Sequence, residues 1–320
     1  MGSKDMYQHV QEHYGSVAQA ENPTHSGAIA KAFGYSEEEL NSIPKDANLG
    51  LSCGNPLAIA SLRKGETVID LGSGAGFDVF LAAKQVGVHG RAIGVDMNKD
   101  MLARARKNQV TSATTDNVSF LEAKITSIPL EDGTADCIIS NCVINLVPED
   151  DKPVVFAEMA RLLKPGGRIA ISDILARKAL PVGLRESAAL YVNCVAGSGT
   201  REDYTRYLKE AGFNDIVIVD TENDLNAYVD MAKEDKHVGC CGQSTKTAAS
   251  SEGKTVSCPE EKGVGCCSKA ENNTTLSSNA SANATILSDK DTQTVATDFG
   301  LADININEWV GSFKIFAVKN

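Results

Sequence analysis

The sequence is poor in positive charge and in long apolar runs. Its 320 residues contain 31 Lys and Arg against 42 Asp and Glu, which gives a formal net charge of -11. A general nucleic-acid binder would show basic patches, so that class is not expected. No apolar run approaches the ~18 residues of a membrane span, and residues 1–5 contain no apolar signal region. We therefore expect a cytoplasmic protein with no nucleic-acid or membrane partner.

Two common cysteine patterns are also missing. The number of cysteines is odd and the chain is not small, so a disulfide framework is not expected. The Cys-x2-4-Cys spacing of zinc sites is absent, which makes zinc a poor fit. Free cytosolic thiols are more often buried, metal-binding or catalytic. The nine cysteines are Cys53, Cys137, Cys142, Cys194, Cys240, Cys241, Cys258, Cys266 and Cys267.

The chain is organised around residues 66–77 (ETVIDLGSGAGF). The apolar run at 68–71 predicts a buried parallel strand. The glycines at 72, 74 and 76 follow it, and residues 78–85 predict a helix. A strand, a glycine turn and a helix N-terminus form a site for a nucleotide-bearing cofactor. Glycine is needed where the backbone and a ligand approach closely.

The spacing of this turn helps to choose the cofactor. G-x-G-x-G differs from the G-x-G-x-x-G of dinucleotide sites. A second strand, 91–95, ends in Asp96, at the position where a carboxylate accepts hydrogen bonds from ribose hydroxyls. We interpret the ligand as S-adenosylmethionine, with NAD as the competing interpretation. The alternative for Asp96 is a solvated loop acid.

Strands and helices alternate from residue 66 to 175. This alternation predicts an α/β, Rossmann-like fold with a mostly parallel sheet and helices on both faces. The ligand should lie outside the carboxyl ends of the strands, near residues 72–76, Asp96, Met97, Ile125 and 140–143. The predicted strands are 66–71, 91–95, 117–121, 135–141 and 167–173, and the predicted helices are 78–86, 98–109 and 151–163.

Further elements flank this unit. Helices are predicted at 5–18, from Ser36, at 183–194 and at 200–210, and strands at 214–220 and 312–318, the last as an antiparallel edge strand. Residues 242–290 are rich in Ser, Thr and Asn and are expected to be disordered. The predicted organisation is an N-terminal region at 1–65, a cofactor domain at 66–182, a metalloid-binding region at 183–238, a low-complexity insertion at 239–300 and a closing strand at 301–320.

The thiols pose the functional question. Soft thiolates suit soft centres, and a pyramidal trivalent metalloid takes three sulfurs and keeps one lone pair. Cys53 precedes the cofactor domain and Cys194 follows its fifth strand, so both can reach the mouth of the crevice. Cys194 could equally be a core residue, Cys137 is expected to be an inert core residue, and Cys142 has a smaller chance of contacting a ligand.

The chain resembles the arsenite S-adenosylmethionine methyltransferases over about residues 5–220 and the last strand. The glycine loop alone would fit any class I methyltransferase, whereas two cysteine motifs carry the arsenic assignment. Those two motifs are 48–56 (NLGLSCGNP) and 191–197 (YVNCVAG). The others are 34–40 (GYSEEEL), 70–78 (DLGSGAGFD), 140–146 (SNCVINL) and 163–167 (LKPGG).

The resemblance implies a class I fold with a seven-stranded sheet and a role for each matching residue. Asp70, Gly72, Ser73, Gly74 and Gly76 would hold the methionine end of the cofactor, Asp96 the ribose, Met97 and Ile125 the adenine, and Asn141 and Val143 would lie near the sulfonium. Cys53 and Cys194 would bind As(III) with a third thiolate, for which Cys240 or Cys241 is predicted. Many relatives carry another cysteine in the loop after the first helix, where 22–27 (NPTHSG) has none.

The resemblance further implies that the protein methylates arsenite, and two other functions compete with this interpretation. Glutathione or thioredoxin would act as reductant, methylated arsenicals would be products and further substrates, and we expect a monomer. One rival is a class I methyltransferase acting on a small organic molecule, such as a quinone or sterol. The other is a thiolate-rich metalloid store without catalytic activity, which leaves the cofactor crevice unexplained.

Overall fold

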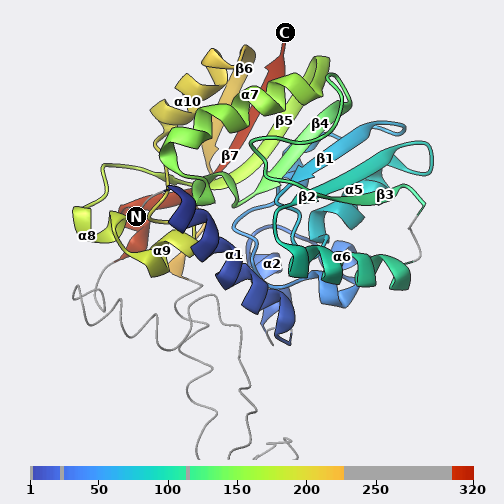
Figure 1. Ribbon diagram of the computed structural model, residues 1–320, viewed down its shortest axis with the longest axis horizontal. Helices are drawn as coiled ribbons and strands as arrows, with labels where there is room; N and C mark the ends of the chain where they lie inside the picture. The colour runs from blue at the N-terminus through green and yellow to red at the C-terminus, as the bar shows by residue number, and fades with distance from the viewer. Residues whose placement is uncertain (1–2, 22–24, 113–115, 227–304) are drawn as a thin grey trace, which may run out of the picture.

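The computed structural model describes residues 3–21, 25–112, 116–226 and 305–320, and within them one seven-stranded sheet forms the centre (Figure 1). The strand order is β3-β2-β1-β4-β5-β7-β6. The strands are β1 (Thr67–Leu71), β2 (Arg91–Asp96), β3 (Val118–Glu122), β4 (Ala135–Asn141), β5 (Leu163–Ala176), β6 (Phe213–Asp220) and β7 (Val310–Lys319).

The predicted fold class is confirmed, with one change at the edge. β1 to β5 pair in parallel, whereas β7 is antiparallel to both β5 and β6. The antiparallel pairing therefore lies at one side of the sheet, as expected. The outermost strand on that side is β6, however, and β7 is inserted between β5 and β6. The C-terminal strand thus lies inside the sheet and pairs on both sides.

Helices cover both faces of the sheet. α7 (Lys152–Leu162) and α10 (Arg201–Glu210) pack over one face, in front of the strands in Figure 1, and α4 (Leu57–Ala60) and α5 (Phe77–Val86) pack over the other. β1 shows how the sequence builds both cores, since Val68 faces the α5 side while Ile69 and Leu71 face the α7 side. Burying each such side chain contributes about 1.5–3 kcal/mol.

The remaining elements lie around the carboxyl ends of the parallel strands. α1 (Ser3–Gln19) runs beneath these ends, between α6 (Lys99–Thr111) and α9 (Ala188–Val192) (Figure 1). The other elements are α2 (Ser26–Ala32), α3 (Glu37–Asn41) and α8 (Val182–Arg185), with short 3-10 turns at η1 (Lys45–Ala47), η2 (Ile144–Leu146), η3 (Glu149–Asp151) and η6 (Ile306–Glu308). No helix in the described ranges has the length and apolarity needed to cross a membrane.

Two predicted boundaries differ from the observed ones. The helix expected at 183–194 is two short helices, because Ser187 caps the start of α9 and Cys194 adopts a left-handed backbone (φ +63°) beyond its end. The turn expected at 164–167 is a bulge within β5, where the register passes from Ala135 opposite Leu163 to Cys137 opposite Arg168. The predicted caps of α3 and α10 are both present as capping boxes.

Candidate functional site

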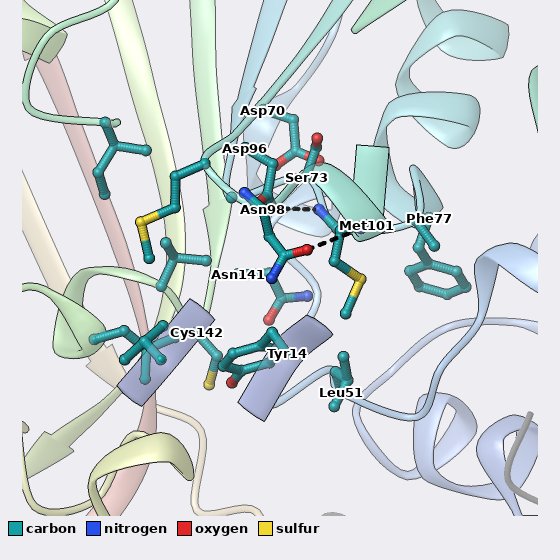
Figure 2. Close-up of a pocket in the computed structure, with 18 of the residues that line it drawn as sticks. Tyr14, Leu51, Asp70, Ser73, Phe77, Asp96, Asn98, Met101, Asn141 and Cys142 are labelled. Carbon is teal, nitrogen blue, oxygen red and sulfur yellow. Dashed lines mark hydrogen bonds between the residues drawn. The ribbon is translucent and has the colours of Figure 1, made fainter. Parts of the chain in front are cut away.

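Two adjoining cavities lie at the carboxyl edge of the sheet. Nine of the ten residues expected to hold a cofactor line the first cavity, namely Asp70, Gly72, Ser73, Gly74, Asp96, Met97, Ile125, Asn141 and Val143. Cys53 and Cys194 line the second. Tyr14, Leu51 and Cys142 line both and so form a common wall. In Figure 2, Asp70, Ser73 and Asp96 lie at one end of the first cavity, and Cys142 and Tyr14 lie at the other.

The floor of the first cavity is the turn between β1 and α5. Gly72 has a φ of +74°, and a Cβ at this position would stand 2.3 Å from Cγ2 of Val143. The amides of Gly72 and Ser73 donate to the carbonyl of Val95 at 2.8 and 3.0 Å, which joins the turn to β2. Gly76 is the N-cap of α5 and does not line the cavity. Its place is explained by its φ of +93° and by two phenylalanine rings beside it.

Asp96 joins the end of β2 to the glycine turn. One carboxylate oxygen accepts from the amide of Gly74 at 2.8 Å, and the other accepts from the amide of Asn98 at 2.8 Å. Burial raises the pKa of Asp96, and these backbone donors oppose the rise. Asp96 is half-buried, and backbone amides engage both of its carboxylate oxygens.

Three carboxyl groups line the first cavity: Asp70, Asp78 and Asp96. Burial raises the pKa of Asp70 well above its usual range, and the charges of Asp78 and Asp96 raise it further. Burial likewise raises the pKa of Asp78 to about 6. Among the residues that the structure describes, none of the three forms a salt bridge. Lys124 also lines this cavity, so carboxyl groups outnumber the ammonium by three to one. Such a lining favours a cationic ligand, because buried carboxylates without a counterion are costly.

Asp78 also connects the first cavity to the cysteine loop, a role that the sequence interpretation missed. Its carboxylate accepts from the hydroxyl of Tyr35 at 2.7 Å and from Nδ2 of Asn141 at 3.1 Å. Asn141 in turn donates to the carbonyl of Gly54 at 3.0 Å, and its Oδ1 accepts from the amide of Cys53 at 3.4 Å. The available signal was the position of Asp78 in the first turn of the helix that follows the glycines.

One polar atom of the first cavity has no partner. The hydroxyl of Ser73 is buried and makes no hydrogen bond within the described structure. Buried hydroxyls are normally paired, so this side chain provides a place for a polar group of a ligand. The glycine turn, the acid at the end of β2, the anionic lining and this hydroxyl together fit a cofactor that carries a ribose and positive charge.

In the second cavity, Cys53 and Cys142 form a disulfide with a Cα–Cα distance of 6.0 Å. The expectation that the cysteines are free thiols is therefore wrong for this pair. The loop of Cys53 is fixed against the sheet, since Oγ of Ser312 donates to the carbonyl of Cys53 at 2.6 Å. The amide of Cys142 donates to the carbonyl of Ser172 at 2.8 Å. Residues 89 positions apart thus meet because both flank the carboxyl end of β4.

Cys194 completes a group of three cysteines. Its Sγ donates to the carbonyl of Cys142 at 2.8 Å, and it is a buried free thiol. Burial raises its pKa well above the usual range, and the charge of Asp173 adds to the rise. The structure thus brings Cys53 and Cys194 into one cavity, together with Cys142, which sequence reasoning had ranked low. The signal for Cys142 was its place directly after β4.

The other cysteines fall into two classes. Cys137 is buried inside β4, where burial raises its pKa to about 12, in agreement with the expected core position. Cys240 and Cys241, predicted to supply the third thiolate, lie outside the described residues, as does the whole predicted low-complexity insertion. Within the described residues, Cys142 is the third cysteine that lines the cavity with Cys53 and Cys194.

The chain is similar in sequence to known methyltransferases. A family profile described as a methyltransferase domain matches residues 62–212. An arsenite methyltransferase of Halobacterium salinarum is 41% identical over 212 residues, which cover 62% of this chain and 54% of that protein. An arsenite methyltransferase of Aquipseudomonas alcaligenes is 36% identical, covering 68% of this chain and 64% of that protein.

A solved structure gives a third comparison. The crystal structure of CrArsM, an arsenic (III) S-adenosylmethionine methyltransferase from Chlamydomonas reinhardtii, matches at 31% identity with a TM-score of 0.49. The match covers 67% of this chain and 71% of that one. The chain spans between half and two thirds of the length of the two curated relatives.

Proposed function

We propose that this chain, which belongs to the arsenite S-adenosylmethionine methyltransferase family, transfers methyl groups from S-adenosylmethionine to trivalent arsenic held by cysteine sulfurs. The observation that carries the proposal is the common wall. An acidic cavity with a glycine turn and a cavity with three cysteines share Cys142, so a methyl donor in one cavity faces a sulfur-bound acceptor in the other.

The first cavity would hold the cofactor through groups already in place. The backbone at Gly72, Ser73 and Gly74 would receive its amino-acid end together with the Asp70 carboxylate, and Asp96 would accept from the ribose hydroxyls. Met97 and Ile125 would line the adenine, and Asn141 and Val143 would lie beside the sulfonium. The bound cofactor supplies an electrophilic methyl group. The negative lining offsets its positive charges, and alignment of the reacting atoms supplies much of the rate.

The second cavity would bind arsenic as the neutral trihydroxide. Each of three thiols exchanges its S–H for an S–As bond, and the proton leaves with an arsenic hydroxyl as water. Burial and Asp173 raise the pKa of Cys194, which keeps this thiol protonated. A protonated thiol suits this reaction, because the substrate brings its own proton acceptors and the protein needs no general base. Cys53, Cys142 and Cys194 are the three sulfurs that the described geometry favours, while Cys240 and Cys241 stay predictions.

The disulfide has a place in the same proposal. Arsenic that donates its lone pair to a methyl carbon is oxidised by two electrons, and it must regain them before it can donate again. Two thiols that become a disulfide release two electrons, and Cys53 and Cys142 stand at disulfide distance. An external thiol, glutathione or thioredoxin, would then reduce the pair. A cytoplasmic location supplies such thiols, and we propose a monomer that detoxifies arsenic there.

Arsenic speciation tests this proposal. The reduced protein is incubated with arsenite, labelled S-adenosylmethionine and glutathione, and the products are separated by chromatography with elemental detection. Mono- and dimethylated arsenicals carrying the label are expected. Label transfer to a quinone or sterol acceptor, with no methylated arsenic under reducing conditions, would favour the organic-substrate rival. Calorimetry that detects no S-adenosylmethionine binding would favour the metalloid store.

A further inference from the structure

A buried carboxylate stands beside the cysteines and bonds to neither arsenic nor cofactor in the proposed methyl transfer. It belongs to Asp173 on β5, which has no exposed surface. Three atoms lie within 4.8 Å of one another, namely the Sγ atoms of Cys53 and Cys142 and one carboxylate oxygen of Asp173. Cys194 is not part of this 4.8 Å group, but it lines the same cavity as the two cysteines, with its Sγ against the Cys142 carbonyl. Trivalent arsenic binds only the three sulfurs, so the carboxylate is a fourth possible ligand that arsenic does not use.

The surroundings of Asp173 resemble the outer shell of a metal ligand. Nδ2 of Asn145 donates to its Oδ1 at 2.8 Å, and the hydroxyl of Tyr204 donates to its Oδ2 at 2.8 Å. The amide of Ile174 also donates to Oδ1, at 2.9 Å. A carboxylate offers about four lone-pair positions, so one stays open after these three. Ligating carboxylates in metal sites are held by hydrogen bonds in this way.

We propose that the reduced protein binds a thiophilic divalent cation, Zn²⁺ or Cd²⁺, in a tetrahedral site formed by Cys53, Cys142, Cys194 and Asp173. Zinc takes four ligands in closed sites, and thiolate and carboxylate are both among its ligand types. Three S–H bonds break, three metal–sulfur bonds and one metal–oxygen bond form, and three protons go to solvent. The buried ammonium of Lys152 offsets part of the negative charge, since it acts on both Cys194 and Asp173.

The three sulfurs cannot bind arsenic and a divalent cation at the same time. Arsenic bound by three sulfurs keeps a lone pair, whereas a four-coordinate d¹⁰ zinc ion has none to give to a methyl carbon. The cation would therefore block arsenic binding without being methylated. This inference concerns metal coordination alone, and it stands or falls separately from arsenite methylation.

X-ray absorption at the zinc edge is the direct test. The full chain is used with Cys240, Cys241, Cys258, Cys266 and Cys267 changed to Ser, so that these five cannot bind the added metal. A phosphine reduces the Cys53–Cys142 disulfide, taking up oxygen from water as it supplies the two electrons. One Zn²⁺ per chain is expected, with three sulfurs at about 2.3 Å and one oxygen at about 2.0 Å. A shell with fewer than three sulfurs, or with no sulfur, would overturn the proposal.

Variants assign the ligands. Asp173→Asn should weaken Zn²⁺ binding by roughly tenfold or more, measured by competition with a chromophoric chelator, and Cys194→Ser should remove one sulfur from the shell. Cys137→Ser, at a buried thiol outside the cavity, is the matched control and should change neither. Circular dichroism establishes that each variant is folded. If Asp173→Asn does not fold, the sulfur count in Cys194→Ser decides. Equal affinity and an equal shell in a folded Asp173→Asn variant would exclude the carboxylate.

Discussion

The two cavities share a wall but are assembled in different ways. The first is built mainly by one strand–turn–helix–strand unit, in which Gly72, Gly74 and Asp96 lie within 25 residues of sequence. The second gathers Cys53, Cys142 and Cys194 from three distant segments. Three carboxyl groups and Lys124 are among the residues that line the first. The second is lined by three cysteines, mostly apolar side chains and the polar His13, Tyr14 and Asn193, and none of its described lining residues is acidic. A cofactor site can therefore be carried by a local motif, whereas the metalloid site depends on the whole fold.

The largest expected effect is a loss of arsenite methylation with cofactor binding retained, which would show that the two cavities have different functions. Cys142→Ser and Cys194→Ser should each lower arsenite methylation by about 100-fold or more, because misplacement of the acceptor alone can cost that much. Calorimetry should show S-adenosylmethionine binding within a few-fold of the unchanged chain. Cys137→Ser is the control for a buried thiol and should keep its activity. Full activity of Cys194→Ser on arsenite would contradict the three-sulfur site.

Gly72→Ala should damage the first cavity in turn. The new Cβ would meet Val143 at 2.3 Å, so binding of S-adenosylmethionine should weaken by at least about tenfold, with a loss of roughly 1–3 kcal/mol in stability from overpacking. Gly166→Ala is a matched control, because Gly166 has nearly the same φ (+75°) with nothing within 4 Å of the added atom. Thermal unfolding and calorimetry measure both variants. Equal losses in the two would assign the effect to backbone strain alone.

The acids of the first cavity should give cofactor binding a pH dependence that arsenic binding lacks. Asp78 has a pKa of about 6 because of burial. Affinity for the cationic cofactor should therefore fall several-fold as the pH drops from 7 to 5, measured by calorimetry, and Asp78→Asn should flatten the profile. In the absence of cofactor, the pH dependence of folding stability has the opposite sign. The folded pKa exceeds the unfolded one, so this group lowers stability as the pH rises from about 4 to 6.

The smallest expected effect concerns Tyr14, which belongs to the common wall between the two cavities. The Tyr14 hydroxyl donates to the carbonyl of Val192 at 3.0 Å, two residues before Cys194. Tyr14→Phe should raise the KM for arsenite a few-fold, in keeping with a hydrogen bond that contributes about 1 kcal/mol. Tyr7→Phe is the matched control, because Tyr7 lies on the same helix, lines only the first cavity and donates to Asp151. An equal rise in both variants would mean that the helix acts on both cavities alike.

The sequence predicted the first cavity well because its signals are local. The glycine turn, the strand that ends in Asp96 and the caps at Ser36 and Thr200 each depend on a few neighbouring residues. Nine residues expected to hold the cofactor line one cavity, but Ile125, Asn141 and Val143 were placed there by the predicted strand ends and not by a local signal. Asp78 was missed because its importance depends on Asn141, 63 positions away.

The second cavity could be predicted only in part. Cys53 and Cys194 were chosen because one precedes the cofactor domain and the other follows its fifth strand, and because their motifs resemble those of a family. Cys142 was given a smaller chance of contacting a ligand, and its meeting with Cys53 depends on how the N-terminal loop lies on β4. The position of β7 inside the sheet was missed for a similar reason, since strand order is a long-range property.

The disulfide between Cys53 and Cys142 affects the folding stability of the protein, which differs between the disulfide form and the reduced form that binds arsenic. It links residues 89 positions apart, and closing a loop of that length removes enough freedom from the unfolded chain to be worth about 4–5 kcal/mol in the chain-entropy account. The thiols can take up arsenic only after this link is opened. The reduced form that binds arsenic is then the less stable one, and once the disulfide has formed the chain keeps the more stable form until a reductant opens the link.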